Sequence, residues 1–356
     1  MAKRESNFEF LRIISMFLVL IVHSDFLCLG YPTLSDLDIN PWQVAWRGFF
    51  ESVSIVCVNL FVLISGYFTI KLRFKSIFSY LYQCLFYSIF IYLFLVFFKL
   101  CDFNFFNSSQ AILISWFMKN QFISNYLALM LISPLLNVFF ERGKPGEIHL
   151  AMFSFSFIAF FMNWLVPVEG GGFLGGYSVL HLMFIYCLGR YIYTFSNLKW
   201  LNYSSLVYFL VYIVFVIFNT FIFLSFFKYS LPWNVWAYNS PIVVIGSLAL
   251  FMCFQKIKFH SYIVNFLAQS SFAVFLFHTN YFVFPHFKNY VIHLNIENSF
   301  FPFGFKISLF LLTVFVFSIL LDQIRKLTYT AISTYFRSLY KFLLRKIALS
   351  FQSDMF

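Results

Sequence analysis

The chain has 356 residues, of which 62% are hydrophobic and only 10% are charged, and its mean hydropathy is +0.84. A soluble domain carries roughly 25% charged residues, so the composition excludes a soluble protein and indicates one that crosses a membrane many times. The formal net charge of +11 would suggest a nucleic-acid partner only if the basic residues formed a soluble patch. They lie instead in short connections between apolar stretches, so we expect membrane lipids and no nucleic acid as partners.

Apolar stretches of about 20 residues recur along the whole chain, and each is long enough to cross the ~30 Å hydrocarbon core of a bilayer as a helix. We therefore predict an all-α fold, a polytopic membrane protein with about ten membrane-spanning helices. The predicted spans cover residues 8–29, 49–70, 77–98, 120–140, 148–166, 174–193, 201–226, 239–255, 265–284 and 303–323.

The positions of lysine and arginine predict the direction of these spans. Cytoplasmic loops carry an excess of both residues. Most of the 24 in this chain fall in segments that are cytoplasmic if the N-terminus is cytoplasmic. We therefore predict that both termini lie in the cytoplasm and that residues 1–325 form a transmembrane domain. Residues 326–356 combine basic and apolar residues at helical spacing, which predicts a basic amphipathic cytoplasmic tail on the anionic inner leaflet.

Arg12 and His23 are two polar residues within the first predicted span, in "FLRIISMFLVLIVHSDF". At 100° per residue, their separation of eleven residues brings them within about 20° of the same helix face, with a rise of about 16 Å. A cation near the cytoplasmic boundary can hold an anionic donor, and a neutral histidine deeper in the membrane can act as a general base toward a hydroxyl. The spacing fits equally well with two side chains that only reach toward the headgroups on either side. Asp25 and Glu51 are both possible partners for this histidine.

Further polar residues lie in other predicted spans, and polar groups inside a membrane are expected to have a function because they are costly to bury. Three histidines on separate spans, beside small or amide residues, predict a polar cavity inside the protein. The Ser-Gly pair in "VNLFVLISGYF" favours close helix packing over a nucleophilic serine. The candidates are Glu51, Asn59, Ser65, His181, Asn239 and His278.

Several familiar catalytic patterns are missing from the sequence. The six cysteines are scattered without a CxxC pair, so we predict neither a metal site nor a disulfide framework. No HExxH, GxSxG or P-loop motif is present, which argues against a zinc protease, a serine hydrolase and a nucleotide-hydrolysing pump.

Taken together, these segments resemble the acyltransferase-3 family of integral membrane acyltransferases, especially the bacterial branch that O-acetylates surface polysaccharides. The resemblance covers about residues 5–325. It begins with the Arg-x10-His signature of "FEFLRIISMFLVLIVHSDF" and the Ser-Gly-aromatic motif of "VNLFVLISGYF". The remaining segments follow in the expected order: "YLALMLISPLLN", "GGYSVLHLMFIYCLGRYI", "YNSPIVVIGSLALF" and "FLAQSSFAVFLFHTN".

The resemblance implies an enzyme of the bacterial plasma membrane that uses acyl-CoA, usually acetyl-CoA, as donor and needs no metal. The acceptor would be a hydroxyl of a cell-surface polysaccharide or a lipid-linked sugar. His23 would be the catalytic base and Arg12 its companion at the donor. Arg73, in "KLRFK", could meet the phosphates of coenzyme A together with Lys71 or Lys75. The polar candidates given above would contact donor or substrate.

One departure from the family concerns "HTN", because relatives often have an acidic residue after this histidine. A carboxylate partner for His278 is therefore in doubt.

Alternatives to direct acyl transfer stay open at this stage. Transfer through an acyl-enzyme on His23 would use the same residues. A transporter or flippase for a lipid-linked glycan, or an assembly partner without acyl-transfer chemistry, would share the spans and the cavity. Transporters usually show broken helices or inverted repeats, and neither is clear in this sequence.

Overall fold

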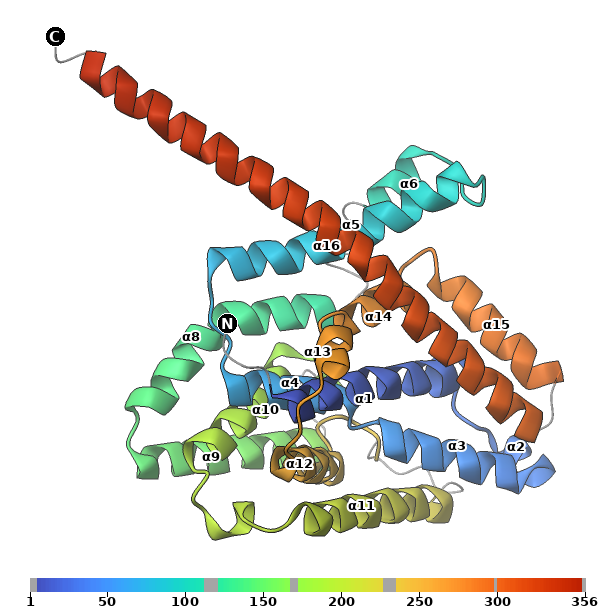
Figure 1. Ribbon diagram of the computed structural model, residues 1–356. Helices are drawn as coiled ribbons and strands as arrows, with labels where there is room; N and C mark the ends of the chain where they lie inside the picture. Colours follow the sequence, from blue (N-terminus) through green and yellow to red (C-terminus); the bar gives the residue numbers. More distant parts are fainter. Residues whose placement is uncertain (1–4, 112–120, 167–171, 227–234, 298–299, 354–356) are drawn as a thin grey trace.

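The structure is a computed structural model that describes residues 5–111, 121–166, 172–226, 235–297 and 300–353, and from residue 335 onward only the backbone. Within these ranges the regular elements are helices, without strands (Figure 1). The predicted all-α class is therefore confirmed.

The helices follow one another along the chain with short connections. They are α1 (Ser6–Val22), η1 (His23–Leu27), α2 (Leu34–Ile39), α3 (Pro41–Ser54), α4 (Cys57–Phe68), α5 (Phe74–Phe97), α6 (Phe105–Ser109), α8 (Gln121–Arg142), α9 (Pro145–Phe157), η3 (Ile158–Leu165), η4 (Leu174–Gly176), α10 (Val179–Thr194), η5 (Lys199–Leu201), α11 (Ser205–Phe226), α12 (Pro241–Lys256), α13 (Tyr262–Ala268), α14 (Ser271–His278), α15 (Phe284–Glu297) and α16 (Phe300–Ser353).

Among the described residues, seven helical stretches are long and apolar enough to cross a membrane, which supports a multi-pass membrane protein. Each contains or overlaps one of the ten predicted spans. They are Ser6–Leu27, Pro41–Phe68, Phe74–Phe97, Gln121–Arg142, Pro145–Met162, Ser205–Ser225 and Phe301–Thr334.

The other three predicted spans fall on shorter helices. The helices α10 and α12 have 16 residues each, which corresponds to about 24 Å of helix against a hydrocarbon core of ~30 Å. The span predicted at 265–284 is divided between α13 and α14. The count of ten and the cytoplasmic position of the termini therefore stay predictions.

The helix α1 lies at the centre of the bundle and contacts α3, α4, α12, α13, α14 and α16. Its C-terminal end widens into the π-helical turn η1, which begins at His23. Such π-turns inside helices are frequent at functional sites. Arg12 and His23 are therefore both carried by the central helix α1 and its terminal turn η1.

Two glycines allow α4 and α10 to pack backbone against backbone. A Cβ atom on Gly66 would lie 2.2 Å from the carbonyl oxygen of Tyr186, and one on Gly189 would lie 2.4 Å from that of Leu63. Small residues permit this approach between membrane helices. The Ser-Gly pair is thus a packing motif, as its sequence predicts, and the Ser65 hydroxyl donates to the carbonyl of Phe61 at 2.9 Å.

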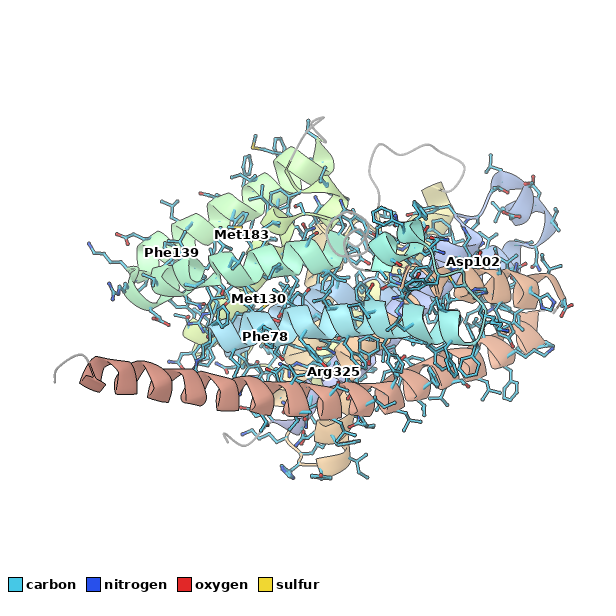
Figure 2. All side chains as sticks on the ribbon, turned by 90° about the horizontal axis from the view of Figure 1, so that it is seen from above. Phe78, Asp102, Met130, Phe139, Met183 and Arg325 are labelled. Atoms are coloured by element: carbon cyan, nitrogen blue, oxygen red, sulfur yellow. The ribbon has the colours of Figure 1, made fainter. Side chains whose placement is uncertain are left out.

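The helix α5 lies between α8 and α16 in the view of Figure 2. The rings of Tyr80 and Tyr126 join it to α8, with centroids 5.9 Å apart. On the other side, the Tyr82 hydroxyl donates to Thr328 Oγ1 of α16 at 2.8 Å. These contacts hold α5 as one wall of the interior.

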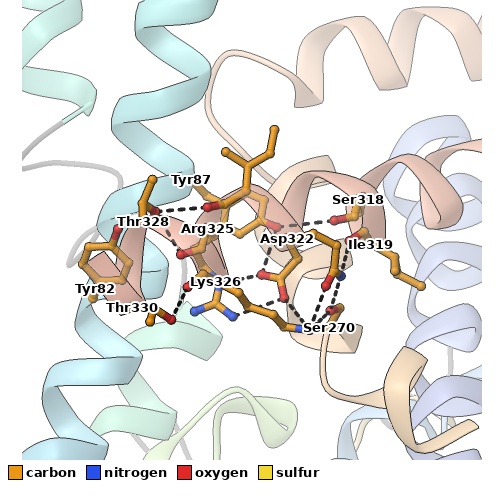
Figure 3. Close-up of polar contacts among 12 residues, drawn as sticks. Tyr82, Tyr87, Ser270, Ser318, Ile319, Asp322, Arg325, Lys326, Thr328 and Thr330 are labelled. Atoms are coloured by element: carbon orange, nitrogen blue, oxygen red, sulfur yellow. Dashed lines mark hydrogen bonds and ion pairs between the residues drawn. The ribbon is translucent and has the colours of Figure 1, made fainter. Parts of the chain in front are cut away.

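Charged residues on α16 are accommodated by a buried cluster of polar contacts (Figure 3). Asp322 is fully buried, and Arg325 Nε donates to its Oδ1 at 2.5 Å. The Tyr87 hydroxyl donates to the same oxygen at 3.3 Å, and Lys326 Nζ donates to Ser270 Oγ at 2.8 Å. Because buried charges are tolerated only when they are paired, this cluster fixes α16 against α5 and the α13–α14 turn.

The C-terminal part of α16 extends away from the other helices (Figure 1). The helix continues without interruption from Phe300 to Ser353, so the boundary predicted between residues 325 and 326 lies inside one helix. The tail is helical, whereas its contact with the inner leaflet and the division into two regions stay predictions.

Candidate active site

One cavity of ≈ 1140 Å³ lies inside the bundle, and Arg12 and His23 both line it. Its described lining residues come from α1, η1, α3, α4, α5, α8, α10, α13, α14 and α15, together with connections such as those before α10 and α12. Arg12 and His23, whose spacing predicts a shared helix face, therefore both face one interior space. Glu51 and Ser65 line the same cavity.

His23 is paired with a second histidine from the far end of the sequence. Its Nδ1 lies 2.8 Å from Nε2 of His278, and Nδ1 of His278 lies 2.6 Å from the carbonyl oxygen of Val274. A carbonyl can only accept, so the Nδ1 of His278 donates to Val274. In a neutral His278 the Nε2 atom then accepts the hydrogen of His23 Nδ1. Nε2 of a neutral His23 is left with a free lone pair, which is what a general base requires.

Asp25 does not orient His23, although the sequence allowed it. Its Oδ1 accepts from Arg47 Nε at 2.5 Å, and Arg47 Nη2 donates to the carbonyl oxygen of Gly30. The guanidinium carbon of Arg47 also lies 5.3 Å from the ring centroid of Phe26. Asp25 and Arg47 thus attach the η1 turn to α3. The two ring nitrogens of His278 contact His23 and the carbonyl of Val274. This geometry agrees with the doubt about a carboxylate partner for His278.

Arg12 has an acidic neighbour that sequence reasoning missed. Its Nη1 donates to Glu9 Oε1 at 2.7 Å, and the Arg12 side chain keeps 32% of its surface exposed. The spacing of three residues between Glu9 and Arg12 on one helix was the signal available in the sequence. A guanidinium has five N–H donors, so Arg12 can hold an anion in addition to Glu9.

Asn59 and His181 meet each other outside the lining of the cavity. Nε2 of His181 donates to Asn59 Oδ1 at 2.9 Å, and Asn59 Nδ2 donates to the carbonyl oxygen of Tyr238 at 3.0 Å. Both side chains are fully buried. They join α4, α10 and the segment before α12, so their geometry gives them a structural role, and contact with a substrate stays a prediction.

The remaining predicted residues also lie away from the cavity lining, as far as the described residues define it. Asn239 is buried next to Tyr238, and His278 lies behind His23. Arg73 is the residue that precedes α5, and its side chain is exposed. Its expected contact with a donor stays a prediction.

A second hollow of ≈ 460 Å³ lies beside the main cavity and is lined by Lys75, the last residue of the "KLRFK" segment and the second residue of α5. Tyr80 and Tyr126 line both spaces. The Tyr126 hydroxyl lies 3.0 Å from Ser65 Oγ, which connects this aromatic boundary to α4. Aromatic residues make up 24% of the chain, so sequence alone offered no reason to select these two.

Among the described residues, no group of three His, Cys, Asp or Glu side chains is arranged to hold a metal ion. We therefore assign no metal ligands. Among the described residues that line the cavity, the basic and acidic side chains are the imidazole of His23, the guanidinium of Arg12 and the carboxyl of Glu51.

Comparison with known proteins adds one finding. A family model described as an acyltransferase domain, of the acyltransferase-3 type, matches residues 5–322. The match begins before Arg12 and ends at Asp322 in the buried cluster of α16. No curated protein and no solved structure matches the chain.

Proposed function

We propose, from the premise that this chain belongs to the acyltransferase-3 family, that it is an O-acyltransferase of the bacterial plasma membrane. It transfers an acetyl or similar short acyl group from a cytoplasmic acyl-CoA to a hydroxyl of a cell-surface or lipid-linked polysaccharide. Membership of the family supports acyltransferase activity in a membrane. The observation that carries the finer proposal is the single cavity that Arg12 and His23 share.

The donor enters at the Arg12 end of the cavity in this proposal. An acyl-CoA carries its thioester at the end of a long flexible arm, so its phosphates can be held far from the reacting carbon. Arg12 and His23 are separated by about 16 Å along α1. Lys75 lies in the hollow beyond Tyr80 and Tyr126, where a cation suits phosphate groups.

His23 acts as the general base. Its Nε2 removes the proton of the acceptor hydroxyl while the hydroxyl oxygen attacks the thioester carbonyl carbon. When the tetrahedral intermediate collapses, the carbon–sulfur bond breaks and His23 returns the proton to the leaving thiolate. One ester and one free thiol replace the thioester and the alcohol. In the variant with an acyl-enzyme, Nε2 itself carries the acyl group between the two steps.

His278 supports this chemistry as a positioning residue. The hydrogen bond between His23 Nδ1 and His278 Nε2 holds His23 in the tautomer with a free Nε2. The same bond strengthens when His23 becomes an imidazolium, because a charged donor makes a stronger hydrogen bond. The remaining contribution of the protein is to bring two substrates together in one cavity.

The test is mass spectrometry of surface glycans from cells that lack the protein and are re-supplied with it. Wild type is expected to restore an acyl-sized mass on a sugar. His23→Ala should nearly abolish this mass at equal membrane level, because loss of a general base costs about 10²–10⁴-fold in rate. His293→Ala is the matched control, since that side chain is largely exposed on α15.

Two results would contradict the proposal. An unchanged acyl mass with His23→Ala would remove His23 from the mechanism. A glycan that appears or disappears as a whole, without change in its acyl mass, would place the protein in export or assembly.

A further inference from the structure

Glu51 is a buried carboxyl group that faces the cavity. It is only 3% exposed and belongs to the cavity lining. Among the described residues, its Oε2 atom has no hydrogen-bond partner. Burying a carboxyl oxygen without a donor is costly, so this atom marks a position at which a ligand can donate a hydrogen bond.

The cation closest to Glu51 along its own helix is engaged elsewhere. Arg47 precedes Glu51 by one turn of α3, a spacing at which opposite charges usually pair. Arg47 instead donates from Nε to Asp25 and from Nη2 to the carbonyl of Gly30. The fold thus directs the guanidinium toward the η1 turn, while the carboxyl of Glu51 faces the cavity.

Aromatic rings gather at the same end of the cavity. Phe26 belongs to η1, three residues after His23, and its ring centroid lies 4.8 Å from that of Trp236 and 4.7 Å from that of Tyr31. All three rings line the cavity. Trp236 Nε1 donates at 3.3 Å to the hydroxyl of Ser52, the residue after Glu51. The aromatic cluster of Phe26, Tyr31 and Trp236 is therefore anchored next to Glu51 and next to the turn that carries His23.

We infer that Glu51 and this aromatic cluster form the acceptor subsite, and that they recognise a ring with several hydroxyl groups, such as a pyranose. A pyranose has C–H faces that pack on aromatic rings and hydroxyls that donate to carboxyl oxygens. One hydroxyl donates to Glu51 while another faces Nε2 of His23. Glu51 is thus a positioning residue that selects which hydroxyl is acylated, and this assignment rests on the proposed function.

The test uses full-length protein in lipid nanodiscs and two kinds of acceptor. Methyl hexopyranosides carry several hydroxyls, whereas cyclohexylmethanol offers a ring with one hydroxyl. Binding is measured by saturation-transfer NMR, and transfer from acetyl-CoA is measured by mass spectrometry. Glu51→Gln should raise the Kd of the bound pyranosides roughly 2–10-fold, as expected for loss of one hydrogen-bond acceptor, and should leave the Kd of cyclohexylmethanol unchanged.

Ser54→Ala is the matched control. Ser54 lies on the same helix, is fully buried, and donates to the carbonyl of Phe50 at 2.6 Å. This variant should bind and acylate both acceptors as wild type does. Glu51→Asp, which keeps a carboxyl group, should retain part of the preference for pyranosides.

The outcomes separate the subsite from the reaction. Three binding results would overturn the subsite. Glu51→Gln could weaken the binding of both acceptors equally, Glu51→Gln could leave pyranoside binding unchanged, or wild type could fail to bind pyranosides. Unchanged regiochemistry and rate of transfer in Glu51→Gln would also overturn it while acyl transfer itself stands. Pyranoside binding that depends on Glu51, without any transfer by wild type, would support the subsite and refute the proposed function.

Discussion

Replacing His278 by phenylalanine removes the hydrogen-bond acceptor of His23 and keeps a ring of similar size. The surroundings suit such a ring, because Phe275 and Phe287 already contact His278, with centroids 6.1 and 5.6 Å away. The structural disturbance is therefore small. Two contacts are lost: the bond from His278 Nδ1 to the carbonyl of Val274, within the same helix, and the 2.8 Å contact with His23 Nδ1. Loss of the second removes the preference for the tautomer that has a free Nε2.

The expected effect is on the chemical step. A hydrogen bond to a group that becomes charged contributes about 1.5–3 kcal/mol, and each 1.36 kcal/mol corresponds to a factor of ten in rate. We therefore expect kcat to fall roughly 10–100-fold in His278→Phe. Because His278 lies behind His23, outside the cavity lining, the KM values for acyl-CoA and acceptor should stay unchanged.

The assay is steady-state acyl transfer by the protein in nanodiscs, with both substrates varied. His278→Gln separates orientation from other roles, since its carboxamide oxygen can accept from His23 Nδ1 near the position of Nε2. This variant should recover most of the lost kcat. His149→Gln is the control, because His149 is a histidine outside the cavity lining whose Nδ1 lies 2.9 Å from the Tyr191 hydroxyl. An unchanged kcat in His278→Phe, or a fall that His278→Gln does not repair, would refute the reasoning.

Two further substitutions test the ends of this arrangement. Arg12→Gln removes the cation at the donor end of the cavity. The KM for acyl-CoA should rise roughly 10–100-fold with a smaller change in kcat. A loss confined to kcat would mean that Arg12 does not hold the donor. Asp322→Ala leaves Arg325 buried without its carboxylate (Figure 3). Breaking such a pair costs about 3–5 kcal/mol, so the detergent-solubilised protein should lose its monodisperse elution peak at a clearly lower temperature than wild type. Equal thermal stability of the two proteins would show that the cluster is not needed to hold α16.

Local geometry explains why part of the site could be predicted from the sequence. Arg12 and His23 lie on one continuous helix, whose period relates them without knowledge of any other element. The tight packing at Gly66 was predictable for a similar reason, because a glycine within an apolar helix has few uses other than close approach. The apolar runs likewise determine that the fold is helical, since a bilayer requires backbone groups to be satisfied within each segment.

The partners of these residues were decided by tertiary structure. The sequence offered Asp25 and Glu51 as partners of His23 without ranking them, whereas the structure pairs His23 with His278. Packing of α14 against α1 brings His278 to His23, while Arg47 engages Asp25 and leaves Glu51 facing the cavity.

The sequence therefore determined the helical class, the apolar runs and the common face of Arg12 and His23, because each depends on neighbours along the chain. The partners of His23, the orientation of Glu51 and the division of 265–284 into two helices depend on which helices pack side by side. Hydrogen bonds between residues 255 positions apart leave no periodic pattern in a sequence, so only the assembled bundle reveals them.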